Sequence, residues 1–206
     1  MRNYLILLVS LIYFSDTYAQ KDLLQAGPMS GYITFREAAI WVQTTESAKV
    51  TVVYWSVEKP EDKKRTIPLV TGRNKAFTTT LVAENLSPGT TYNYLLEINN
   101  TPIELDYPCI LKTPNLWQWR EQPPSFSFLS GSCVYISEKE TDRPGKPYGG
   151  DYHILSNMAK QNAALMLWLG DNTYYREVDW DSRTGIYYRN THTRSLPDLQ
   201  PLLGKM

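Results

Sequence analysis

Apolar and polar residues alternate in short segments along the first half of the chain, the pattern of strands that bury one face. The segments that predict strands are 38–44, 48–57, 65–70, 77–83, 91–98 and 103–112. Turns rich in proline, glycine and asparagine separate them, for example Ser87-Pro88-Gly89. About seven strands within about 90 residues are typical of an antiparallel β-sandwich. We therefore expect a sandwich domain at 24–113.

The pattern changes after the sandwich. Three prolines within 114–125 interrupt regular pairing, which predicts a linker. Beyond it lie, in order, a short apolar strand at 126–130, a loop, a helix at 151–162 and a continuous apolar segment at 163–169. Continuous apolar strands are typical of parallel sheets that are covered on both faces. This order predicts an α/β domain at 126–206, whose site lies beyond the carboxyl ends of the strands.

The first residues have the features of a secretory signal peptide. Arg2 precedes an apolar run from Tyr4 to Phe14, and the segment ends at the small residue Ala19. The run is too short to span a bilayer as a stable helix, and an uncleaved anchor is the alternative. We expect a signal peptide at 1–19 and an exported protein, periplasmic or secreted, with no transmembrane segment after cleavage.

The charge balance argues against one class of partner. The chain has 21 lysines and arginines against 21 aspartates and glutamates, a formal net charge of zero. A protein that binds nucleic acid or an anionic membrane through its overall charge carries a basic excess. We therefore expect no nucleic-acid binding by charge.

The two cysteines, Cys109 and Cys133, allow two interpretations. In an exported protein, two cysteines commonly form a disulfide. Alternatively, Cys133 is a metal thiolate and Cys109 a buried free thiol. The spacing of the two residues slightly favours the disulfide, whereas the residues around Cys133 favour the thiolate.

Three potential metal ligands follow the two predicted parallel strands. Cys133 comes after the first strand, and Asp171 and Tyr174 come after the second, where Gly170 permits a sharp turn. Phenolate and carboxylate oxygens favour ferric iron, and thiolate also tolerates zinc, whereas calcium and magnesium prefer ligand sets made entirely of oxygen. The alternative is that Asp171 caps a turn, Tyr174 packs in the core and Cys133 is inert or disulfide-bonded.

Both halves of the chain resemble known families. The segment from Leu86 to Tyr94 resembles the Leu-x-Pro-Gly-Thr-x-Tyr turn of fibronectin type III domains, in which a tyrosine hydroxyl bonds back to the chain at a strand corner. Phe126-Ser-Phe-Leu-Ser-Gly-Ser-Cys133, with Leu-Trp-Leu-Gly-Asp171-Asn-Thr-Tyr174, resembles the PhoD-like alkaline phosphatase family of the calcineurin-like superfamily. Most calcineurin-like enzymes have Asp-x-His where this chain has Ser-Cys, which points to the PhoD-like branch.

The PhoD-like resemblance implies an exported metallophosphatase that hydrolyses small phosphate esters at a two-metal site. Cys133 and Tyr174 would ligate a ferric ion, and Asp171 would bridge it to a second cation, calcium in characterised relatives. Arg194, in a segment that borders the expected site, is a further candidate for contact with the substrate phosphate.

The later motifs of the family are missing from this sequence. It contains no Asp-Asp-His run, and its only histidines are His153 and His192. We therefore expect the fold to be an N-terminal fibronectin- or immunoglobulin-like sandwich followed by the first, truncated part of a metallophosphatase domain, with an incomplete site. The alternatives are an exported binding module and an inactive remnant.

Overall fold

The computed structural model describes residues 22–145, 148 and 151–205. The predicted signal peptide at 1–19 lies outside these residues. The chain divides into two compact units, Met1–Asn115 and Leu116–Met206, and the division falls within the range predicted as a linker. No helix in the described part of the chain has both the length and the hydrophobicity of a membrane span.

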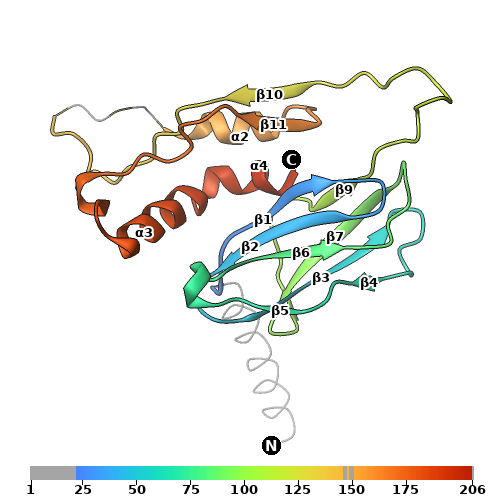
Figure 1. Ribbon diagram of the computed structural model, residues 1–206, viewed down its shortest axis with the longest axis horizontal. Coiled ribbons are helices and arrows are strands. Elements are labelled where there is room, and N and C mark those ends of the chain that lie inside the picture. The colour runs from blue at the N-terminus through green and yellow to red at the C-terminus, as the bar shows by residue number, and fades with distance from the viewer. Residues whose placement is uncertain (1–21, 146–147, 149–150, 206) are drawn as a thin grey trace, which may run out of the picture. The chain divides into compact units, whose positions relative to one another are not determined.

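The first unit is an antiparallel β-sandwich (Figure 1). One sheet has the order β1-β2-β6, formed by Leu24–Ile33, Ala38–Thr44 and Thr78–Ala83. The other has the order β4-β3-β7-β8, formed by Lys64–Arg65, Lys49–Ser56, Thr91–Ile98 and Thr101–Pro102. The short strands β5 (Leu69–Val70) and β9 (Ile110–Lys112) pair with β3 and β7, and the 3-10 turn η1 (Arg73–Lys75) precedes β6.

Alternation along the strands builds the sandwich core. Ile40 and Val42 of β2, Val50 of β3, and Leu96 and Ile98 of β7 are all completely buried and belong to one apolar cluster. Burial of one such side chain contributes about 1.5–3 kcal/mol. The fold class predicted from the alternation is therefore confirmed.

The sandwich differs from the prediction in three strands. β1 was not predicted, because Gly27, Pro28 and Gly31 break its alternation and its pairing with β2 contains register shifts. The predicted strand 65–70 is interrupted between β4 and β5. Of the predicted strand 103–112, only the end forms β9.

The resemblance to the fibronectin turn extends to its hydrogen bond. The hydroxyl of Tyr92, at the start of β7, accepts a hydrogen bond of 2.8 Å from the backbone N–H of Ser87. This bond ties the Leu86–Tyr94 corner together, as expected from the tyrosine corner of such domains.

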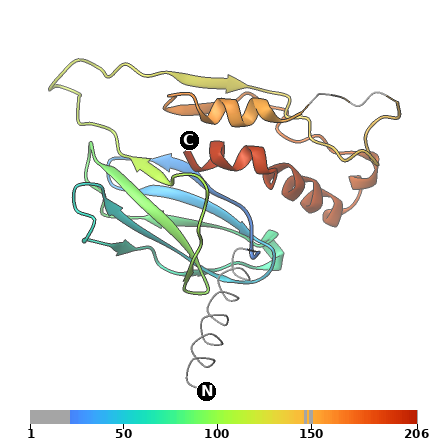
Figure 2. The same cartoon turned by 180° about the vertical axis from the view of Figure 1, so that it is seen from behind.

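The second unit contains a two-stranded parallel sheet. β10 (Phe128–Gly131) pairs with β11 (Leu165–Trp168), and α2 (His153–Ala159) connects them, as both cartoon views show (Figures 1 and 2). The remaining elements are η2 (Glu177–Asp179), α3 (Arg183–Arg194), η3 (Pro197–Leu199) and α4 (Gln200–Lys205). The predicted strand–helix–strand order is therefore present.

One face of this sheet is exposed. A segment as apolar as 163–169 is typical of a sheet that is covered on both faces, but Leu167 is 43% exposed and Leu169, directly after the strand, is 66% exposed, as a truncated domain predicts. Met166 and Trp168, on the opposite face, lie toward α2. Within the described residues, therefore, only one face of the sheet is covered.

Hydrogen bonds and a few buried leucines stabilise the helices α2 and α4 of this unit. α2 is shorter than predicted: it begins after Tyr152, and the carboxylate of Asp151 accepts a hydrogen bond of 3.3 Å from the backbone N–H of His153. α4 packs beside α2, and the Lys205 ammonium donates to the carbonyl of Ala159 at 2.9 Å. Leu155, Leu199, Leu202 and Leu203 are buried.

A buried arginine joins three further parts of the second unit. Arg189 of α3 has no exposed surface. Its Nε donates to Asp179 of η2 and its Nη1 to Glu138 of the loop after β10, both at 2.8 Å. We call these three residues the Arg189 cluster.

Hydrogen bonds lower the pKa of Glu138 within this cluster. Its partial burial alone would raise the pKa. Bonds donated by Tyr188, Arg189 and Thr141 outweigh that effect and hold the pKa at about 2, against an ordinary value of 4.5. Glu138 therefore favours the folded state through its ionised form.

The two cysteines lie in different units and are both free. Cys109 is buried in the sandwich core, and burial raises the pKa of its thiol to about 11. Cys133 is exposed. The structure thus has no Cys109–Cys133 disulfide, which was one of the two interpretations of the sequence.

We predict that the two thiols differ sharply in reactivity. Iodoacetamide at pH 8 should alkylate Cys133 in the native metal-free protein and spare Cys109, because Cys109 is both inaccessible and protonated. Peptide mass spectrometry measures the modification, and in urea both residues should react. A Cys109–Cys133 linked peptide from air-oxidised native protein would contradict this prediction.

We also predict that Glu138 makes the stability of the second unit depend on pH. Because its folded pKa lies below the unfolded value, its contribution is fully present above about pH 4.5 and is lost as the pH falls toward about 2. Glu138→Gln should flatten the pH dependence of urea unfolding in this range, measured by pulsed hydrogen exchange of peptides that span α3. Glu140→Gln, a change of an exposed carboxylate in the same loop, is the control and should leave the pH dependence as in the wild type.

Candidate metal centre

Parallel pairing brings the ends of β10 and β11 to the same level. Gly131 lies opposite Trp168, and the carbonyl of Gly131 accepts a hydrogen bond of 2.8 Å from the N–H of Leu169. Beyond the strands, the N–H of Val134 donates to the carbonyl of Asp171 at 2.9 Å. The loops that contain Cys133 and Asp171 are therefore hydrogen-bonded to each other beyond the strands.

The backbone turns sharply at both positions. Gly170 has a φ of 107°, a value that suits glycine, as its place in the sequence predicted. Asp171 and Cys133 have φ values of 50° and 61°. The left-handed region is uncommon for residues with a side chain, and such strained positions concentrate at functional sites. The two turns direct both side chains toward one point.

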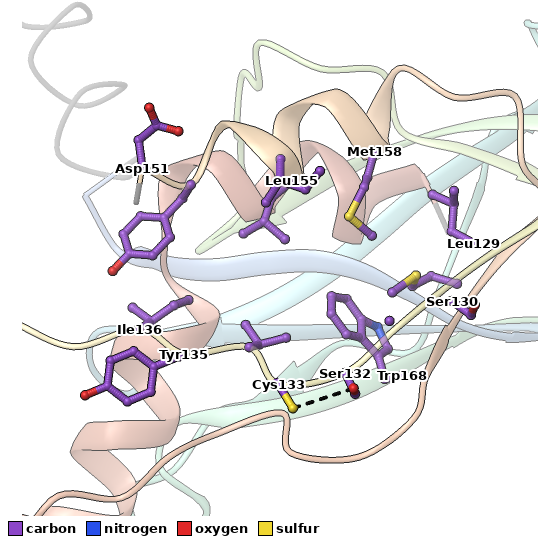
Figure 3. A pocket seen from close by; sticks show the side chains of 15 residues that line it. Leu129, Ser130, Ser132, Cys133, Tyr135, Ile136, Asp151, Leu155, Met158 and Trp168 are labelled. Carbon is purple, nitrogen blue, oxygen red and sulfur yellow. Dashed lines mark hydrogen bonds between the residues drawn. The ribbon is translucent and has the colours of Figure 1, made fainter. Parts of the chain in front are cut away.

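Three potential ligands meet at the Asp171 carboxylate. Its Oδ2 accepts a hydrogen bond of 2.9 Å from the Tyr174 hydroxyl and a longer one of 3.8 Å from Cys133 Sγ. Ser132 Oγ donates to the same sulfur at 3.6 Å (Figure 3). The structure thus brings together the thiol, carboxylate and phenol that the sequence singled out.

The surroundings of Tyr174 favour its neutral form when no metal is bound. Contact with the Cys133 thiol and the hydrogen bond to Asp171 raise the pKa of the Tyr174 phenol above its usual range. A cation among these groups would reverse that preference, because a positive charge stabilises phenolate and thiolate. Metal binding at this position would therefore release protons.

The donor set fits a ferric ion. It combines one sulfur with carboxylate and phenol oxygens within hydrogen-bonding distance of one another. Asn172, next to Asp171 in the sequence, has a buried Oδ1 without a hydrogen-bond partner among the described residues. In the described part of the chain, histidine, cysteine and acidic side chains form no metal-binding group of three or more, so the phenol of Tyr174 is essential to this set.

The other candidate residues do not join this group. Arg194 ends α3, and its guanidinium has no polar partner among the described residues; burial lowers its pKa. His153 lies 3.5 Å from Asp198, and His192 lies 3.6 Å from Glu138. Neither the arginine nor the histidines contact Cys133, Asp171 or Tyr174.

A cavity of about 530 Å³ opens beside Cys133, between α2 and the two strands (Figure 3). Its walls are mainly apolar: Leu155 and Met158 of α2 face Trp168 of β11 across it. Cys133 lines the cavity, whereas Asp171 and Tyr174 do not. The candidate centre therefore lies at the border between an apolar hollow and the polar loops.

Sequence reasoning missed an aromatic contact at the centre. The ring of Tyr135 lies 5.4 Å from that of Tyr174, and its hydroxyl donates to Asp142 at 2.8 Å. It also missed the Arg189 cluster. The residues of this cluster come from three separate segments, and no local motif marks Glu138 or Asp179.

Comparison of the sequence with known families matches only part of the chain. A family described as "Domain of unknown function (DUF7800)" matches residues 21–107, which is less than half of the chain. No curated protein matches in sequence.

Two solved structures match most of the chain. The structure of PhoD matches 86% of it with a TM-score of 0.63 and 17% identity. Purple acid phosphatase PPD1 from yellow lupin (Lupinus luteus) seeds also matches 86%, with a TM-score of 0.53 and 14% identity. The chain spans 36% and 33% of the lengths of these two structures. It therefore has an N-terminal β-sandwich followed by elements of a metallophosphatase-like fold.

Proposed function

We propose that this chain contributes Cys133, Asp171 and Tyr174 to the two-metal centre of an exported phosphoesterase that hydrolyses small phosphate esters. The observation that carries the proposal is the convergence of a thiol, a carboxylate and a phenol at the paired ends of β10 and β11. The metallophosphatase-like fold supports it. Since the chain spans about a third of those two structures, the activity of a whole enzyme is part of the proposal.

Each donor has a distinct role. Cys133 and Tyr174 would hold a ferric ion, and Asp171 would bridge it to a second cation, calcium. Such a metal pair polarises the phosphoryl oxygens and lowers the pKa of a bound water. The contacts with Cys133 and Asp171 raise the pKa of Tyr174 and favour its neutral form, and the left-handed turns at Cys133 and Asp171 hold both side chains at the rim of the sheet. Arg194 is a candidate contact for the substrate phosphate.

We predict that the full chain binds ferric iron through Tyr174. Titration with ferric citrate should produce the visible charge-transfer band of an iron-bound phenolate. Tyr174→Phe should abolish the band, because phenylalanine has no oxygen to offer. Tyr175→Phe is the matched control: it removes the next phenol along the chain, which bonds to Asn190 instead, and should keep the band.

Inorganic phosphate tests the phosphoesterase part of the proposal. It should shift the band of the iron-loaded chain by occupying open coordination positions. Absence of the band, or a band that survives Tyr174→Phe, would contradict the metal centre, and a band indifferent to phosphate would contradict the phosphoesterase. Hydrolysis of a chromogenic phosphodiester by the loaded chain would support the function and contradict the expectation of an incomplete site.

A further inference from the structure

We propose that Arg189 is a positioning residue for the candidate metal centre: it binds Glu138 and Asp179 together and so fixes the Tyr174 phenol beside Asp171. The inference rests on the function proposed above. Arg189 itself contacts none of the three donors. It acts through two chains of contacts that start at its guanidinium and end at Tyr174.

The first chain of contacts runs through the loop after β10. Glu138 accepts a hydrogen bond from Arg189 and begins a turn in which its carbonyl accepts the N–H of Asp142 at 2.9 Å. Asp142 in turn accepts the hydroxyl of Tyr135, whose ring packs against Tyr174. Arg189 thus supports one side of the Tyr174 ring.

The second chain of contacts runs through the segment after β11. The Asp179 Oδ2 that binds Arg189 also accepts the backbone N–H of Arg176 at 2.7 Å. Arg176 lies two residues after Tyr174, so this bond fixes the backbone on the other side of the phenol. The Nε of Arg176 donates to the carbonyl of Thr141 at 3.0 Å and links the two chains of contacts.

Burial restricts the side chains of Arg189 and Asp179, whereas Glu138 is 21% exposed. Arg189 is fully buried and Asp179 is 2% exposed. Gly185 of α3 allows the close approach, because a Cβ there would lie 2.7 Å from the Cα of Asp179. A lysine ammonium has three donors on one nitrogen, so it cannot reproduce the spacing of the bonds that Nε and Nη1 of Arg189 make to Asp179 and Glu138.

Arg189→Lys should therefore shift the phenolate–iron band and weaken ferric binding, by less than the roughly 10- to 100-fold loss that follows a change of a group bonded directly to a ligand. The probe is ferric citrate, added to the full chain. Glu138→Gln removes the charge and one of the two acceptor oxygens from the first chain of contacts only, and should give a smaller change in the same direction. It is also the variant to use if Arg189→Lys does not fold.

Leu202→Ala is the control for a merely structural role. It removes a buried side chain of α4 and destabilises the same unit without touching the Arg189 cluster, so the band should stay at the wild-type position. If the wild type shows the band and neither Arg189→Lys nor Glu138→Gln alters it, the positioning role is wrong and the metal centre stands. If the wild type shows no band, the proposed function fails and the positioning role falls with it.

Discussion

The parallel pairing of β10 with β11 is the constraint on which the candidate centre depends. The two strands end together, with Gly131 opposite Trp168, so the loops that follow start side by side. The bond from Val134 to Asp171 prolongs that pairing by three residues on each strand. Left-handed turns then direct Cys133 and Asp171 toward each other. A slip of one residue in this register would break the Val134–Asp171 bond and move Cys133 out of step with Asp171.

Different interactions stabilise the two units. The sandwich buries alternate aliphatic residues between two sheets, and apolar burial accounts for its cohesion. The second unit has few buried aliphatic residues and a cavity of about 530 Å³ beside α2. Its loops depend on directional bonds at Arg189. A buried ion pair adds little net stability, but loss of one partner costs about 3–5 kcal/mol because the other charge stays buried. Such a cluster therefore disfavours other arrangements of the loops that it joins.

Features that depend on local sequence were predictable. Alternation predicted the sandwich, the Leu86–Tyr94 segment predicted the bond of Tyr92, and the positions of Cys133, Asp171 and Tyr174 at strand ends predicted their convergence. Features that depend on distant segments were not predictable. Glu138 and Arg189 are 51 residues apart, and neither lies in an apolar pattern. β1 was not predicted because its glycines and its proline break the alternation. The exposure of Leu167 depends on which other segments cover the sheet, and the sequence around Leu167 does not show this.

In the proposed centre, one iron ion would bind a sulfur and a phenol oxygen at the paired strand ends. X-ray absorption spectroscopy of the ferric-loaded full chain tests it most directly, because sulfur and oxygen neighbours scatter differently. We predict one sulfur neighbour in the first coordination shell, which Cys133→Ser removes and Cys109→Ser leaves in place. A shell of oxygen and nitrogen alone in the wild type, or a sulfur neighbour that persists in Cys133→Ser, would contradict it.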